Sequence, residues 1–112
     1  MQKEITIDWK DGENTLKGKV WIKRLTFREK NQLEEESTDV KIVNGQPIVK
    51  VSTAKMKEFS LIKGVLKSEV VDEKNQPLLF NYEGIGRLPQ EVGDMLFEEF
   101  TDLNSVDPKK KD

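Results

Sequence analysis

The chain has 112 residues, the size of one domain. Its charged fraction of 36% slightly exceeds its hydrophobic fraction of 35%, so we expect a thin core and a heavily solvated exterior. Histidine and cysteine are both absent, which excludes disulfides and the usual zinc, haem and nucleophile–histidine sites. The net charge of −2 argues against binding driven by the charge of nucleic acid.

The first residues lack the apolar segment of a secretory signal. No apolar run approaches the roughly 18 residues that a membrane span requires. We therefore expect a soluble, cytoplasmic protein that does not bind a membrane.

Two strands are expected near the N-terminus. Alternating apolar residues predict a half-buried strand over 3–9. Turn chemistry around Asp11-Gly12 predicts a loop of several residues, followed by a second strand over 17–25. In this strand Trp21 falls on the opposite face from the other apolar side chains, where it is either covered by a helix or exposed for a partner.

A short helix and a second hairpin follow. Thr26 and Glu29 have the spacing of a capping box, which predicts a surface helix that runs into the acidic stretch 34–36. We interpret that stretch as a solvated helix end rather than as a docking site for a basic partner.

The strongest local signal is Asn44-Gly45 between two β-branched runs. It predicts a type I′ hairpin over 40–51, because both central residues of that turn need positive φ. Pro47 comes just after the turn, which predicts that its strand begins there or lies at an edge.

The remaining elements are helical. Apolar residues at helical spacing predict a central helix over 54–71, in which Gly64 permits close packing. Asn81 is expected to cap a single helical turn over 82–85. Pro89 fits the first turn of a last amphipathic helix, which ends near 104.

These elements predict an α+β fold, in which two β-hairpins form a small antiparallel sheet packed against two amphipathic α-helices plus a short helix. We expect a single domain over 1–104 and a disordered lysine-rich tail over 105–112.

Three apolar residues do not fit the stripes of the predicted elements. Trp21, Leu61 and Phe97 are therefore the candidates for an apolar patch that binds a partner. The Gly84-Ile85-Gly86 step lacks the third glycine of a dinucleotide site, so we interpret it as a tight turn. We expect a non-enzymatic protein, with no catalytic, cofactor-binding or metal-binding residue.

A second hypothesis is a small nucleic-acid-binding or regulatory module. The strand Lys19–Arg24 interleaves basic residues with Trp21, as a base-stacking platform does. A partly buried tryptophan between solvated lysines is the simpler interpretation. The three lysines of the tail contribute little at physiological salt.

Four segments together resemble a known family. They are LTFRE at 25–29, SEVVD at 68–72, PLLF at 77–80 and LPQEVGDML at 88–96. In this order they resemble the tail assembly chaperone proteins of long-tailed phages and related prophages. The resemblance covers about three quarters of the chain, and it omits the hairpin over 40–51 and the lysine-rich tail.

The resemblance implies a non-enzymatic role in virion morphogenesis in the host cytoplasm. Such chaperones bind the aggregation-prone tape measure protein and help the tail tube form around it, and they are not kept in the finished particle. An amphipathic groove would accept apolar segments of that partner. A structural role in the tail itself fits almost as well.

Overall fold

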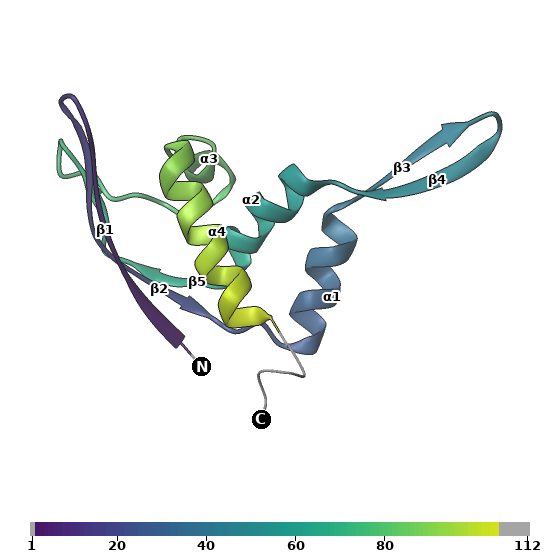
Figure 1. The fold of residues 1–112 in the computed structure, drawn as a ribbon, viewed down its shortest axis with the longest axis horizontal. Coiled ribbons are helices and arrows are strands. Elements are labelled where there is room, and N and C mark those ends of the chain that lie inside the picture. The colour runs from purple at the N-terminus through teal and green to yellow at the C-terminus, as the bar shows by residue number, and fades with distance from the viewer. Residues whose placement is uncertain (1, 106–112) are drawn as a thin grey trace.

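The computed structural model describes residues 2–105 and confirms an α+β fold (Figure 1). Most of the expected lysine-rich tail, residues 106–112, lies outside the described residues. The elements in chain order are β1 (Gln2–Asp11), β2 (Asn14–Lys23), α1 (Phe27–Glu36), β3 (Thr38–Val43), β4 (Gln46–Val51), α2 (Thr53–Gly64), β5 (Val65–Ser68), β6 (Val71–Asp72), α3 (Tyr82–Ile85) and α4 (Gln90–Asn104).

The main sheet is built on the hairpin β1–β2, whose antiparallel pairing runs from Gln2 opposite Lys23 to Asp11 opposite Asn14. The connection is therefore a two-residue turn, tighter than the expected loop of several residues. Gly12 makes it possible, because its φ of 63° is unfavourable for other residues. β5 and β6 pair with the other edge of β2 and complete a four-stranded sheet.

The second hairpin does not join this sheet. β3 and β4 form a separate two-stranded sheet, so the expectation that both hairpins share one sheet is wrong. The physical reason is that single residues, Ser37 and Ser52, join the hairpin to the end of α1 and the start of α2, so it projects from these helices and pairs with no strand of the main sheet. The turn itself is confirmed, since Asn44 and Gly45 have φ values of 53° and 77°. Figure 1 shows this hairpin projecting from the opposite end of the molecule to the β1–β2 turn.

The central helix is shorter than expected. The predicted helix over 54–71 ends at Gly64, where Val65 turns to an extended conformation and starts β5. Gly64 does permit close packing, because a Cβ atom there would lie 2.5 Å from the ring of Phe100 on α4. After this crossing, the chain satisfies its backbone hydrogen bonds by pairing with β2 instead of continuing the helix.

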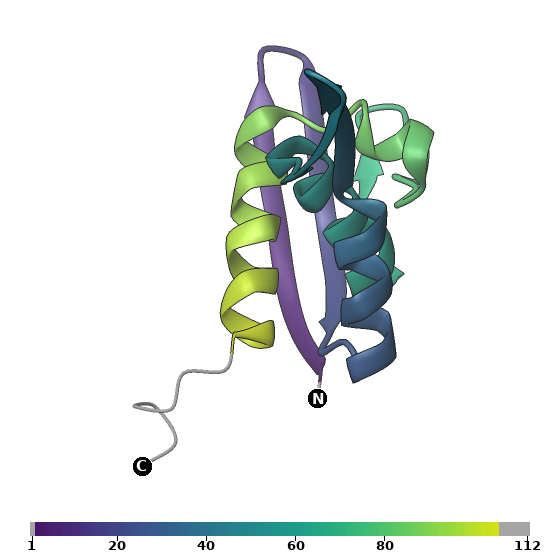
Figure 2. The same ribbon diagram turned by 90° about the vertical axis from the view of Figure 1, so that its right-hand side faces the viewer.

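The core lies between the main sheet and the helices α2 and α4, and Figure 2 shows α4 running beside the length of β1. The side chains of Val20 and Ile22 on β2 are completely buried. The buried apolar residues are Ile5, Ile7, Leu16, Val20, Ile22, Leu25, Leu33, Leu61, Val70, Ile85, Val92, Leu96 and Phe100.

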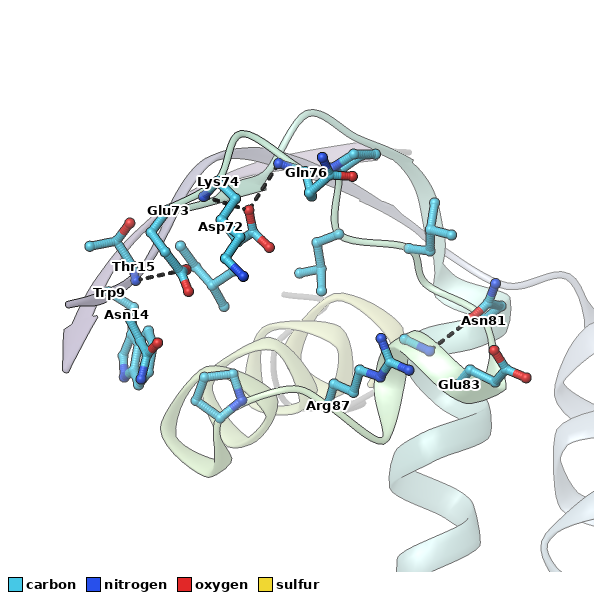
Figure 3. A pocket seen from close by; sticks show the side chains of 16 residues that line it. Trp9, Asn14, Thr15, Asp72, Glu73, Lys74, Gln76, Asn81, Glu83 and Arg87 are labelled. Atoms are coloured by element: carbon cyan, nitrogen blue, oxygen red, sulfur yellow. Dashed lines mark hydrogen bonds between the residues drawn. The ribbon is translucent and has the colours of Figure 1, made fainter. Parts of the chain in front are cut away.

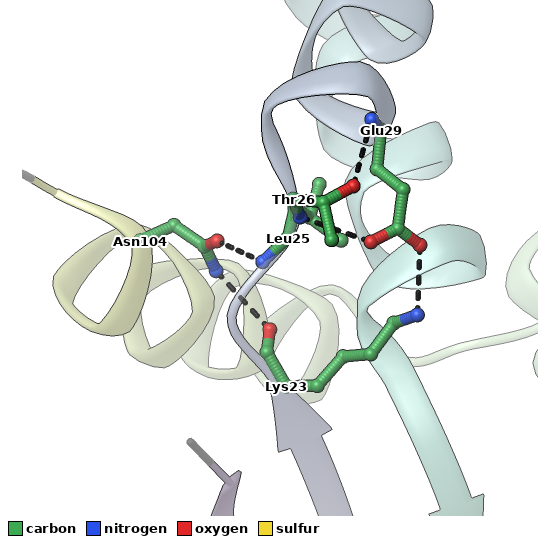
Figure 4. A network of polar contacts seen from close by, with 5 residues as sticks. All are labelled: Lys23, Leu25, Thr26, Glu29 and Asn104. Carbon is green, nitrogen blue, oxygen red and sulfur yellow. Dashed lines mark hydrogen bonds and ion pairs between the residues drawn. The ribbon is translucent and has the colours of Figure 1, made fainter.

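A buried amide side chain fixes the end of α4 to the turn between β2 and α1 (Figure 4). Asn104 Oδ1 accepts a hydrogen bond of 2.7 Å from the backbone N–H of Leu25. Its Nδ2 donates to the carbonyl oxygens of Lys23 at 3.3 Å and of Phe100 at 3.0 Å. Both ends of the amide are therefore satisfied in a buried position.

The capping box at the start of α1 is confirmed. The Thr26 hydroxyl accepts from the N–H of Glu29, and the Glu29 carboxylate accepts from the N–H of Thr26. Lys23 Nζ lies 2.7 Å from the other carboxylate oxygen. The hydrogen bond from Lys23, followed by that from Thr26, lowers the pKa of Glu29 to about 2.

Within residues 2–105, none of the helices combines the length and the apolar character needed to cross a bilayer.

We expect Asn104→Ala to lower the free energy of unfolding by about 2 kcal/mol, because it leaves the buried N–H of Leu25 without an acceptor. Urea denaturation followed by circular dichroism measures this. Thr101→Ala, at an exposed position of the same helix, is the control and is expected to change the value by less than about 0.5 kcal/mol. An equal effect of both substitutions would contradict the role given to Asn104.

Protonation of Glu29 is expected to account for part of the stability that the fold loses in acid. Its folded-state pKa of about 2 lies below the ordinary 4.5, so the ionised carboxylate favours the folded state above about pH 4.5. That contribution is lost as the pH falls from about 4.5 to about 2. Glu29→Gln is expected to flatten the stability profile in this range, whereas Glu35→Gln, at an exposed position of α1, retains the slope. Denaturant midpoints measured between pH 2 and pH 6 check this.

Candidate functional site

Six of the ten exposed large apolar side chains of residues 2–105 lie on the hairpin β3–β4, residues 38–51, which we call the arm. The side chains of Val40, Ile42 and Val49 are 62%, 77% and 66% exposed. Val43, Ile48 and Val51 are also exposed. An apolar surface of this kind on a projecting element is typical of a site that binds another protein.

The two faces of the arm differ in character. Directly opposed residues of an antiparallel pair share a face. One face is apolar, and we call it the apolar face; its opposed pairs are Thr38 with Val51, Val40 with Val49, and Ile42 with Pro47. The other face is mixed, with Asp39 opposite Lys50, Lys41 opposite Ile48, and Val43 opposite Gln46.

Hydrogen bonds fix the root of the arm to the two helices that flank it. The buried hydroxyl of Ser37 donates to the carbonyl oxygen of Leu33 on α1 at 2.7 Å. The N–H of Ser52 donates to the carbonyl oxygen of Ser37 at 2.7 Å, and the hydroxyl of Ser52 caps α2. Past this root, the arm consists of two strands alone, which are marginally stable in water unless a further strand or surface covers them.

The three residues predicted to bind a partner do not form one patch. Leu61 is only 3% exposed and belongs to the core, so its assignment to an exposed patch is wrong. It was placed off the apolar stripe of a long helix, but the face of α2 turned towards α4 is the buried one.

Trp21 and Phe97 lie on different sides of the main sheet. Trp21 alternates with the buried Val20 and Ile22, so its side chain is on the outer face, where Lys67 Nζ lies 5.1 Å from the ring centroid. Phe97 is half-buried on α4, which packs on the inner face, and it stacks on Phe100 with ring centroids 6.5 Å apart. Each has a neighbour within the chain, and the structure does not bring them together.

A cleft of about 650 Å³ opens between the β1–β2 turn, the loop after β6 and the segment that leads into α4 (Figure 3). Its polar groups hold local structure. Trp9 Nε1 donates to Glu91 at 2.7 Å, and the N–H of Thr15 donates to Glu73 at 3.3 Å.

Two further polar side chains that line the cleft also hold local structure. The Asp72 carboxylate accepts from the N–H groups of Lys74 and Gln76, each at 2.9 Å, and Asn81 caps α3. The part of the chain that the structure describes holds no cluster of carboxylates that could bind a metal ion. The cleft is therefore a weaker candidate for a functional site than the arm.

The strand Lys19–Arg24 presents few free positive charges. Lys19 Nζ lies 3.5 Å from a carboxylate oxygen of Glu4, and Lys23 is paired with Glu29. Lys67 covers the ring of Trp21 on the face where a base would stack. This arrangement lends no support to a base-stacking platform.

We compared the chain with family models, curated proteins and solved structures, and none of the three comparisons gave a match. These comparisons therefore do not bear on its function.

Gly45→Val tests whether the arm is a separate, weakly held unit. The Gly45 φ of 77° strains a β-branched residue by about 1–2 kcal/mol, and a Cβ there meets no neighbouring atom within 4 Å. We expect roughly tenfold faster amide exchange in the arm with an unchanged global unfolding midpoint. Gln46→Val, one residue away without positive φ, is the control and is expected to leave exchange unchanged. A lowered global midpoint in Gly45→Val would show that the arm is part of the core unit.

Proposed function

We propose that this chain is a non-enzymatic protein that binds another protein through the apolar face of its arm. The observation that carries the proposal is the exposure of Val40, Ile42 and Val49 on an element that the other residues of 2–105 leave uncovered. Burial of such side chains is worth about 25 cal/mol per Å², so a partner that covers this face gains affinity from it.

We further propose that the partner is a phage tail component, such as the tape measure protein, which the chain would bind during virion assembly. The four segments that resemble tail assembly chaperones support this. An apolar, solvent-exposed β-surface also suits a partner whose own apolar segments aggregate when they are left uncovered.

The arm falls between the segments that carry the resemblance. The segment 25–29 forms the entry to α1, and the segments 68–72, 77–80 and 88–96 form the sheet edge and the start of α4. We call residues 2–37 and 52–105 the body. In this proposal the resembling segments are part of the body, and the arm is the element with which this chain selects its partner.

Co-expression with phage tail proteins, the tape measure protein first, tests the proposal. We expect the chain to raise the soluble yield of the tape measure protein and to co-purify with it. The triple substitution Val40→Thr, Ile42→Thr and Val49→Thr keeps β-propensity but removes the apolar surface, and is expected to weaken this binding at least about tenfold.

Leu79→Ser is the matched control, because Leu79 is exposed on the body rather than on the arm. It is expected to bind like the original chain, and circular dichroism checks that all variants fold. Two results together would exclude the tail-assembly role: no binding to any tail protein, and a gene that lies outside a cluster of tail genes. Binding that survives the triple substitution would exclude the arm as the contact.

A further inference from the structure

The backbone of β3 has an unused set of hydrogen-bonding groups along its outer edge. In an antiparallel pair, hydrogen-bonded and non-hydrogen-bonded positions alternate. The bond from Ser52 N–H to the Ser37 carbonyl oxygen makes this pair a hydrogen-bonded one. The pairing register then makes Asp39, Lys41 and Val43 the next positions bonded to β4.

The same alternation turns the N–H and C=O groups of Thr38, Val40 and Ile42 away from β4. A two-residue type I′ turn gives the same result independently, because the residues that flank it, Val43 and Gln46, form a hydrogen-bonded pair. Among residues 2–105, no strand pairs with this edge.

The two edges of the arm are not equivalent. On β4 the outward positions are Pro47, Val49 and Val51, and Pro47 has no N–H to donate. Proline at an outward position is the usual way to block pairing at a sheet edge. On β3 all three outward residues have both a donor and an acceptor, so β3 is the edge that is open to another strand.

We propose that this edge pairs with the β3 edge of a second copy of the chain. The two β3 strands would run antiparallel about a twofold axis at Val40, which gives a four-stranded sheet in the order β4–β3–β3–β4. Val40 would face Val40 of the second copy, and Thr38 would face Ile42. Each of these outward pairs exchanges both of its N–H···O hydrogen bonds.

Charge complementarity identifies the occupant as a second copy and selects this register. On the mixed face, the twofold pairing places Asp39 opposite Lys41 of the second copy, and this opposite-charge pair occurs twice. A shift of the axis by one residue in one direction puts Lys41 opposite Lys41. A shift in the other direction puts Asp39 opposite Asp39. Like charges directly opposed are unfavourable, so of these three registers only the one centred on Val40 is favoured, and it is the one that opposes Asp39 to Lys41.

In the single copy, Asp39 already contacts Lys55 of α2, whose Nζ lies 2.5 Å from Oδ1. A carboxylate has acceptor sites on both oxygens, so it can hold Lys55 and a second lysine at once. The incoming Lys41 would therefore complete a cluster at the root of the arm.

The pairing would also enlarge the surface on which the proposed function depends. Opposed residues share a face, so the apolar faces of the two arms lie on the same side of the four-stranded sheet. Edge pairing alone buries far less than the roughly 800 Å² per partner of a standard stable interface. We therefore expect a weak, concentration-dependent dimer, which a bound partner would reinforce.

Sedimentation equilibrium of the chain alone tests the dimer without any tail protein, so its failure is distinct from failure of the proposed function. Lys41→Asp and Asp39→Lys each place like charges opposite each other in a homodimer, and each is expected to weaken self-association at least about tenfold. An equimolar mixture of the two variants restores opposite charges in both pairs and is expected to associate as strongly as the original chain.

A pair of proline substitutions tests the edge itself. Val40→Pro removes an outward N–H at the centre of the β3 edge, whereas Val49→Pro makes the same change at its cross-strand partner on the β4 edge. Neither substitution removes a hydrogen bond between β3 and β4. We expect Val40→Pro to abolish dimerisation and Val49→Pro to preserve it. Circular dichroism checks that both variants fold.

Three results would overturn the proposal. The first is a chain that stays monomeric up to millimolar concentration. The second is a mixture of the two charge variants that stays monomeric although the original chain associates. The third is an equal loss of association in both proline variants.

Discussion

The hydrogen bonds of Asn104 fix the end of α4, and the end of α2 and the start of β5 depend on where α4 then lies. The amide joins the end of α4 to the backbone at Leu25, so the helix lies along the sheet with Phe100 facing α2. Contact with the Phe100 ring allows only glycine at position 64. Because the helix ends there, residues 65–68 extend and take the free edge of β2. The second hairpin is joined to α1 and α2 by single residues, pairs with no strand of this sheet, and projects as the arm.

The arm is a separate two-stranded unit held between α1 and α2. Its apolar face has the composition of a buried strand, but neither of its strands pairs with the main sheet. The arm is held at its root, through Ser37, Ser52 and the ion pair of Asp39 with Lys55, and past that point it depends on its own two strands. Exposing Ile42 and Val49 to water costs free energy that a partner can recover on binding. The body positions this apolar surface but contributes no side chain to it.

Local signals predicted local structure well. The capping box of Thr26 and the type I′ turn at Asn44-Gly45 each involve neighbouring residues, and both are confirmed. The end of α2 and the place of the second hairpin could not be predicted, because both depend on contacts between residues far apart in the sequence. The apolar spacing of a helix happens to continue past Gly64 into β5, so periodicity alone gave no sign of the break. Leu61 was misplaced for the same reason, since the buried face of α2 is decided by α4.

The proposed partner surface was not predicted, because the sequence alone does not distinguish a buried strand from an exposed apolar strand. The alternation of Val40, Ile42, Val49 and Val51 is typical of a buried strand and of an exposed strand with one apolar face. The charged residues distinguish the two cases. A strand that is buried on both faces cannot accommodate Asp39 and Lys41, whereas an arm with one solvated face can. Pro47 further indicates that the edge formed by β4 is blocked to pairing with another strand. A β-hairpin with one apolar face, one charged face and a proline on only one edge is therefore a pattern from which an exposed arm with a directed binding edge can be predicted.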